Sequence, residues 1–124
     1  PELLGNLKKR GFKLALASAA DRIKVDANLK AAGIGFELFD VILSGNDVER
    51  KKPFPDVYIK ACKNIGATPQ NSIVIEDAVN GIKAAVAAGC MSCGITSSFS
   101  ESELLDAGAD FVKAETVEIA SLLK

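Results

Sequence analysis

Several features that would assign a chain to a common protein class are absent from this sequence of 124 residues. It contains no histidine that could complete a zinc site with its cysteines. No apolar run approaches the length of a membrane-spanning helix, and the first residues do not have the pattern of a signal peptide. The formal net charge of -1 gives no basic field for nucleic acid and no acidic tail. We therefore expect one domain that binds neither nucleic acid nor membrane.

The three cysteines are too few for a disulfide framework in a chain of this size. Cys90 and Cys93 have the CxxC spacing of redox and zinc sites. However, CMSCGITS is predicted to be a strand, which points residues three apart to opposite faces rather than toward one site. A redox motif needs a helix N-terminus that lowers the thiol pKa. We therefore favour buried thiols over a thiol function, and a reducing compartment, which predicts a cytoplasmic protein.

The remaining sequence alternates helical and strand patterns. Strands separated by helices of this length imply right-handed crossovers and a parallel sheet. We therefore predict an α/β fold, a Rossmann-like three-layer parallel sheet with helices on both faces. Asp21 is the expected cap of the second helix, and Gly11, Gly33 and Gly66 are expected to end helices. Helices are predicted over residues 2–10, 21–32, 55–65, 81–89, 101–107 and toward Leu123, and strands over residues 12–18 (covered on both faces), 40–43, 72–76, 91–96 and 110–112.

In open parallel α/β sheets, ligands bind beyond the carboxyl ends of the strands. Ser18 ends the first predicted strand, where its hydroxyl and the N–H groups of Ala19 and Ala20 could bind a phosphate oxygen; the alternative is a helix cap. Lys52 precedes Pro53, which favours an extended conformation from which the ammonium could reach a phosphoryl group. The alternative for this lysine is a solvated basic loop.

The strongest local signal is the pair Glu76–Asp77, directly after the strand SIVI. Adjacent carboxylates repel each other unless a cation or hydrogen-bond donors satisfy them. Mg²⁺ typically takes one or two protein carboxylates together with waters and phosphate oxygens. The alternative is that Asp77 caps the following helix while Glu76 is solvated. Gly81 lies just beyond, where the absence of a side chain permits close approach.

Three segments, in the order ALAS, KKPFPD and VIEDAVNGIKAAVAAGC, carry a family resemblance. They resemble motifs two, three and four of the haloacid dehalogenase superfamily, and the forms KPxPD and EDxxxGxxAAxxAG are similar to its β-phosphoglucomutase-like branch. The resemblance runs over nearly the whole chain. The stretch SAADRIKVDANLKAAG also resembles the corresponding domain of chloroplast suppressor-of-quenching proteins, which makes the chloroplast the alternative location.

This resemblance implies a role for each candidate residue. Ser18 and the Ala19 amide would bind the transferring phosphoryl group, and Lys52 would neutralise it and the nucleophile. The pair Glu76–Asp77 would hold Mg²⁺, directly or through water. Arg22 is a weaker candidate for contact with the substrate, a small phosphorylated metabolite such as a sugar phosphate.

The resemblance also implies parts that this sequence does not contain. No Asp-x-Asp follows an apolar strand, whereas the family carries its nucleophile and general acid–base in a DxDxT/V motif on the first, central strand. That strand and the substrate-selecting cap would precede Pro1, so we expect residues 1–124 to be a core domain that is incomplete at its N-terminus. Its absence would leave two unpaired strand edges. The edges would stay open, pair with each other, swap between chains in self-association, or accept a complementing N-terminal segment.

Two functions remain open at this point. The first is Mg²⁺-dependent phosphoryl transfer, as a phosphatase or phosphomutase, in which an upstream Asp attacks a phosphomonoester and this chain alone has little or no turnover. The second is a non-catalytic module that keeps the fold for binding or regulation in a larger protein. A dinucleotide-binding domain is disfavoured, because Gly33-Ile-Gly35 does not complete GxGxxG.

Overall fold

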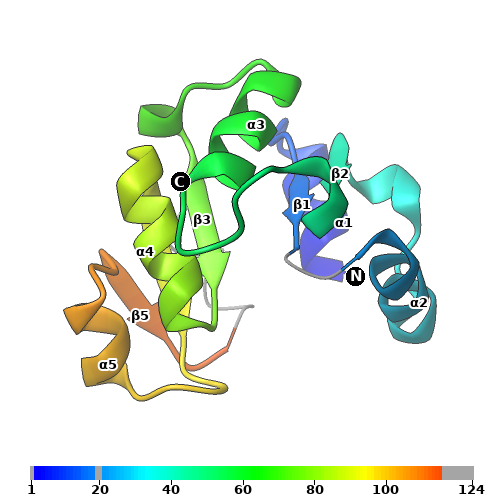
Figure 1. The fold of residues 1–124 in the computed structure, drawn as a ribbon. Helices are drawn as coiled ribbons and strands as arrows, with labels where there is room; N and C mark the ends of the chain where they lie inside the picture. The colour runs from blue at the N-terminus through cyan, green and yellow to red at the C-terminus, as the bar shows by residue number, and fades with distance from the viewer. Residues whose placement is uncertain (1, 19–20, 116–124) are drawn as a thin grey trace.

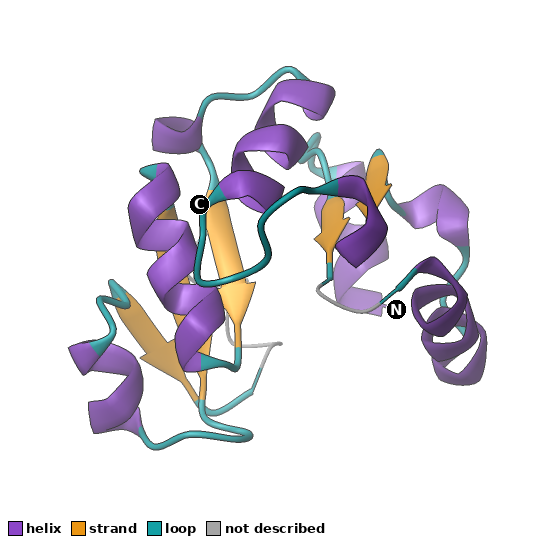
Figure 2. Ribbon diagram, viewed as in Figure 1, coloured by secondary structure: helices purple, strands orange, loops and turns teal. Residues whose placement is uncertain are grey.

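The computed structural model describes residues 2–18 and 21–115, and these form an α/β fold with parallel strands (Figure 1, Figure 2). This confirms the predicted alternation of elements, whereas the helix expected toward Leu123 lies outside the described residues. None of the described helices is long and apolar enough to cross a membrane. The elements are α1 (Glu2–Lys9), β1 (Ala15–Ala17), α2 (Arg22–Ala32), β2 (Val41–Leu43), α3 (Asp56–Ile65), β3 (Ile73–Glu76), α4 (Val79–Ala88), β4 (Met91–Ile95), α5 (Glu101–Asp106) and β5 (Phe111–Lys113), with short 3-10 helices at Phe36–Leu38, Gly45–Asp47 and Pro69–Asn71.

The helix ends follow the local signals in the sequence. Asp21 caps α2, where its carboxylate accepts a hydrogen bond from the Lys24 N–H at 2.9 Å. Gly33 ends α2 and Gly66 ends α3 with φ angles of 70° and 71° respectively, a left-handed conformation that glycine adopts without steric cost. These predicted boundaries are confirmed.

The strands form two parallel sheets rather than one. β1 pairs with β2, and β4 lies between β3 and β5. Among the described strands, β1 and β3 do not pair with each other, so each has one edge without a partner. Of the alternatives for a missing central strand, pairing of the two edges with each other does not occur among the described strands, and the parallel sheet is divided at this point.

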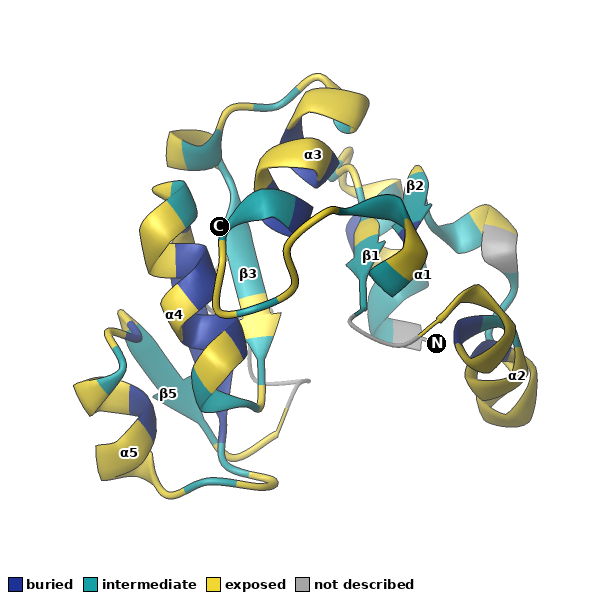
Figure 3. Cartoon of the chain, viewed as in Figure 1, coloured by how far each residue is buried: buried dark blue, intermediate teal, exposed yellow. Residues whose placement is uncertain are grey.

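Helix α3 connects the two sheets, because it packs against β1, β2 and α4, while α4 covers β3 and β4. Their inner faces form the main apolar cluster, and their outer faces are exposed (Figure 3). Helices α4 and α5 share one face of the three-stranded sheet. The opposite face carries Ile73, Cys93, Ile95 and Phe111. Helices on both faces of this sheet therefore stay a prediction.

One strand prediction is wrong in its extent and burial. The strand expected over residues 12–18 is limited to Ala15–Ala17, where Ala15 is exposed and the next two residues are half-buried. The strand was expected to be covered on both faces. It is more exposed because it has a partner strand on one edge only among the described strands.

Candidate functional site

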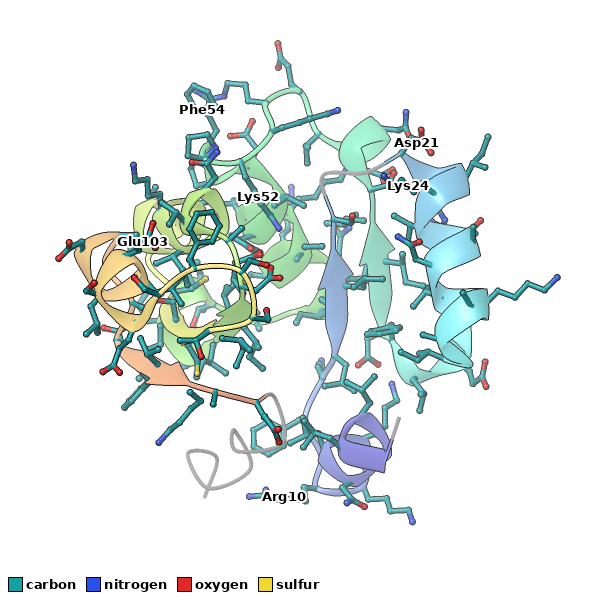
Figure 4. The ribbon with its side chains drawn as sticks, turned by 90° about the horizontal axis from the view of Figure 1, so that it is seen from below. Arg10, Asp21, Lys24, Lys52, Phe54 and Glu103 are labelled. Carbon is teal, nitrogen blue, oxygen red and sulfur yellow. The ribbon has the colours of Figure 1, made fainter. Side chains whose placement is uncertain are left out.

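The carboxyl ends of β1 and β3 are joined by the side chain of Lys52. Its Nζ donates to the carbonyl oxygen of Ala17 at 3.2 Å and to Oε2 of Glu76 at 2.9 Å. The Lys52 and Glu76 side chains are 13% and 12% exposed. Figure 4 shows Lys52 directed inward, between the two groups of strands, whereas Phe54 points outward. The solvated-loop alternative is therefore wrong for this lysine.

The loop before α3 holds Lys52 by short-range contacts. The Phe54 N–H donates to the carbonyl of Lys51 at 3.1 Å, which closes a turn around Lys52. On the outer side, Arg50 pairs with Asp56 in the first turn of α3 at 2.9 Å, and this hydrogen bond lowers the pKa of Asp56. The basic neighbours of Lys52 thus face solvent and the helix start, while Lys52 faces the site.

The Glu76 carboxylate has hydrogen-bond donors on both oxygens. Oε2 accepts from Lys52 and from the Tyr58 hydroxyl, each at 2.9 Å. Oε1 accepts from the backbone N–H groups of Asp77 and Ala78, each at 3.2 Å. Ala78 is the N-cap of α4 and provides no side-chain cap. The alternative in which Asp77 caps this helix and Glu76 is solvated is therefore wrong.

Gly81 explains how Glu76 fits beside the first turn of α4. A Cβ at Gly81 would collide with Cγ, Cδ and Oε2 of Glu76. Because glycine has no side chain, the Glu76 side chain occupies the space where a Cβ would lie. This agrees with the close approach that the sequence predicted at Gly81.

Asp77 is turned to a different part of the chain than Glu76. It is exposed, and its Oδ2 accepts from the hydroxyls of Ser97 and Ser98, each at 3.3 Å. These serines follow β4, so they lie at the carboxyl end of a third strand. Neither serine was among the residues predicted from the sequence, although the strand-end rule that selected Ser18 applies equally to this segment.

The other predicted site residues are less closely connected. The Ser18 N–H donates to the Leu43 carbonyl at 2.9 Å, which extends the β1–β2 pairing to the site, next to the carbonyl that Lys52 contacts. Arg22 forms an ion pair with Asp26 one turn along α2 at 2.8 Å, and its side chain is 48% exposed. Ala19 lies outside the described residues.

The two carboxylates match the ligand type of Mg²⁺ but make a partial site. In the described part of the chain, no group of three or more His, Cys, Asp and Glu side chains is arranged to hold a metal ion. Mg²⁺ often uses only one or two protein carboxylates, and it takes waters and phosphate oxygens as its other ligands. Asp77 is exposed and its two hydrogen bonds from hydroxyls are long, so a hydrated cation has access to it. Each Glu76 oxygen already accepts two hydrogen bonds, so Glu76 would take part by exchanging one of these donors for the cation or for a water bound to it. As a pair of carboxylates, the two residues fit Mg²⁺.

Tyr58 is a site residue that the sequence pattern placed only in the apolar stripe of α3. It is 6% exposed, its hydroxyl contacts Glu76, and Lys52 Nζ lies 5.1 Å from the centre of its ring. Burial and the nearby Glu76 charge raise the pKa of Tyr58, so the phenol stays protonated and acts as a donor. The available signal was chemical, because a buried tyrosine hydroxyl needs a hydrogen-bond partner.

The cysteines do not form a second site. Cys62, Cys90 and Cys93 are buried and are not disulfide-bonded. Burial, together with the nearby Cys62, raises the pKa of Cys90 to about 12. Since the thiolate is the reactive form, this environment confirms the prediction of buried structural thiols.

Comparison with known proteins relates this geometry to one family. Residues 1–95 match the family model described as haloacid dehalogenase-like hydrolase. The protein SUPPRESSOR OF QUENCHING 1, chloroplastic, of Arabidopsis thaliana is 43% identical over 96% of this chain and 11% of its own length. Phosphoglycolate phosphatase of Escherichia coli K12 is 35% identical over 85% of this chain and 41% of its own length.

Solved structures give the same result for the fold. A protein from Thermotoga maritima provisionally described as a β-phosphoglucomutase has a TM-score of 0.88 and 30% identity, covering 98% of this chain and 56% of its own. A mutant of CbbY from Rhodobacter sphaeroides, in complex with xylulose-(1,5)bisphosphate, has a TM-score of 0.84 and 32% identity, covering 95% and 53%. The chain thus spans from about a tenth to just over half of the relatives that it matches.

Proposed function

Because the chain belongs to the haloacid dehalogenase-like hydrolase family, we propose that it supplies the phosphate- and metal-binding residues of a Mg²⁺-dependent phosphoryl-transfer site. The observation that carries this proposal is the contact of Lys52 with Glu76 and with the end of β1, next to the exposed Asp77. This contact places the Lys52 ammonium and the carboxylates of Glu76 and Asp77 at the carboxyl ends of strands from both sheets.

Each residue has a proposed role in this site. The Lys52 ammonium, which is nearly buried, neutralises the charge that develops on the transferring phosphoryl group. Ser18 and the amide of Ala19 bind the phosphoryl oxygens. Glu76 and Asp77 hold Mg²⁺, which when bound supplies further charge neutralisation. Arg22 is a weaker proposal, because reaching a substrate requires it to leave its pair with Asp26.

The substrate that we propose is a small phosphomonoester, such as a sugar phosphate. The relatives that support it are a phosphoglycolate phosphatase and a structure that holds a sugar bisphosphate. The nucleophile is proposed to be an Asp from a segment outside residues 1–124. It attacks phosphorus in line, and the substrate oxygen leaves as an aspartyl-phosphate forms.

Phosphate release from a generic phosphomonoester tests this proposal. We expect Mg²⁺-dependent turnover by a protein that carries this chain together with its upstream segment, and little or none by residues 1–124 alone. Lys52→Gln and Asp77→Asn should each lower the turnover rate about 10²–10³-fold. Lys51→Gln and Asp106→Asn, which change exposed residues of the same charge, should leave it unchanged. Robust turnover by residues 1–124, abolished by Asp77→Ala, would show that the nucleophile lies within the chain.

A non-catalytic module is the second candidate, and one observation favours it. The chain matches only 11% of the length of the Arabidopsis relative, so a similar domain occurs there within a much larger protein. An upstream segment without an intact DxDxT/V motif, together with the absence of turnover, would support this candidate. The name of that relative also supports the chloroplast as the alternative to a cytoplasmic location.

A further inference from the structure

The side chain of Tyr58 contacts both members of the central ion pair. Its hydroxyl donates to Oε2 of Glu76 at 2.9 Å, and the Lys52 ammonium lies 5.1 Å from its ring centre. The Lys52 ammonium also donates to the same Oε2. One aromatic residue therefore presents its edge to the anion and its face to the cation.

Packing alone does not explain why this residue is a tyrosine. The neighbouring buried residues of α3, Val57, Ala61 and Cys62, belong with the Tyr58 ring to the apolar cluster beneath the helix. A phenylalanine ring would fill the same volume and would need no hydrogen-bond partner. The hydroxyl is the part that packing does not require, and its partner is a site carboxylate rather than a backbone carbonyl.

The contact fixes the orientation of two charged groups that come from different elements. Glu76 ends β3 and Lys52 lies in the loop before α3, so neither holds the other by local backbone geometry. With two donors on Oε2 and two amides on Oε1, the carboxylate has little freedom to rotate. The ring face limits the positions that the Lys52 ammonium can take.

We propose that Tyr58 is a positioning residue of the phosphoryl-transfer site, whose hydroxyl fixes Glu76 and, through Glu76, the ammonium of Lys52. This inference rests on the proposed function, since it assigns Tyr58 to that site. Residues that orient a metal ligand through a hydrogen bond typically contribute about 10–100-fold to metal affinity or activity. Loss of the hydroxyl alone should therefore be measurable without loss of the fold.

The test is Tyr58→Phe in a protein that carries residues 1–124 together with the upstream segment, with two direct readouts besides turnover. We expect the Mg²⁺ affinity, measured by calorimetric titration, to fall about 10-fold or more. We expect solvent exchange of the Lys52 ammonium protons, followed by NMR, to become faster by about the same factor. Ile59→Val, at the next position on the exposed side of α3, is the control and should change neither readout. The melting temperature verifies that each variant is folded.

A double-mutant cycle with Glu76→Gln separates positioning from a general loss of packing. If the hydroxyl acts through Glu76, Tyr58→Phe should add almost nothing to the Lys52 exchange rate in the Glu76→Gln background. Equal effects in both backgrounds, or an unchanged exchange rate in Tyr58→Phe alone, would overturn the proposal. If the wild-type protein binds no Mg²⁺ and turns over no substrate, the proposed function fails. The exchange rates would still decide whether Tyr58 positions Lys52.

Discussion

The β1–β2 pair and the β3–β4–β5 sheet are built from the same kind of parallel strand but differ in how well they are buried. β4 has a strand on each side, and every residue of it except Met91 is buried. Among the described strands β1 has one partner, and none of its three residues is fully buried. Burial therefore follows the number of neighbouring strands more closely than the apolar content of the segment.

This difference shows which contacts hold the two-stranded β1–β2 sheet, the smaller pair, in place. A two-stranded unit is marginally stable in water unless it packs against something else. For β1 and β2 the main support is α3, which also packs against α4 on the other sheet. The candidate site includes Tyr58 of this shared helix and Lys52 of the loop before it, so its geometry depends on how firmly α3 holds the β1–β2 pair.

The largest effect should come from emptying the core of the larger sheet. Leu104 is fully buried and packs on Gly94 of β4, where a Cβ would lie within 3.0–3.3 Å of the leucine side chain. Leu104→Ala should lower the free energy of unfolding by about 2–5 kcal/mol. The matched change Leu16→Ala, in the half-buried β1, should cost only about 1 kcal/mol. Chemical denaturation measures both, and equal costs would contradict the difference in packing between the sheets.

A smaller effect should come from cutting the connection between the sheets at the site. Lys52→Gln removes the ammonium that joins Ala17 to Glu76, and should cost about 1–3 kcal/mol because it leaves a nearly buried carboxylate without its ionic partner. Amide exchange at Ser18, whose N–H is bonded to β2, should become faster. The exposed control Lys51→Gln should stay within about 0.5 kcal/mol of wild type. Unchanged exchange at Ser18 would show that α3 alone holds the end of β1.

The smallest effect should come from acid, and it should appear in the smaller pair. The Leu14 N–H and the Lys8 ammonium hydrogen-bond to Asp40 and hold the pKa of that carboxyl below its ordinary value of 3.8. The ionised carboxylate therefore contributes stability above pH 3.8, which is lost as pH falls through the lower folded-state pKa. The side chain is about a third exposed, so we expect a modest loss. Faster amide exchange at Leu14 at low pH, absent in Asp40→Asn, is the measurement.

Local signals in the sequence were sufficient for the ends of the helices. Asp21 and Gly66 mark their boundaries by side-chain and backbone chemistry that acts within one turn. Strand extents were predicted less well, because pairing decides them: residues 12–14 belong to the same largely apolar run as β1 but are not in the ladder. The division of the sheet was expected from the family resemblance alone.

The candidate site was predicted only in part, because some of its contacts follow from local sequence signals and others do not. Lys52, Glu76 and Asp77 each follow a strand or precede a helix in a recognisable motif, so their positions could be read from the sequence. Tyr58 was assigned to the apolar stripe, since helical periodicity describes its ring but not the direction of its hydroxyl. The contact of Asp77 with Ser97 depends on two loops twenty residues apart, which no local pattern specifies.

The glycine at position 81 exchanges helix propensity for the geometry of the candidate site. Alanine is favoured over glycine inside a helix by about 1 kcal/mol, so propensity alone favours alanine at this position of α4. The added methyl group would take the volume that Glu76 now occupies and would force its carboxylate away from Lys52. Since the loss of this ion pair is expected to cost about 1–3 kcal/mol, a selection for heat resistance would retain the glycine, and a rule that replaces every helical glycine by alanine would misjudge this position.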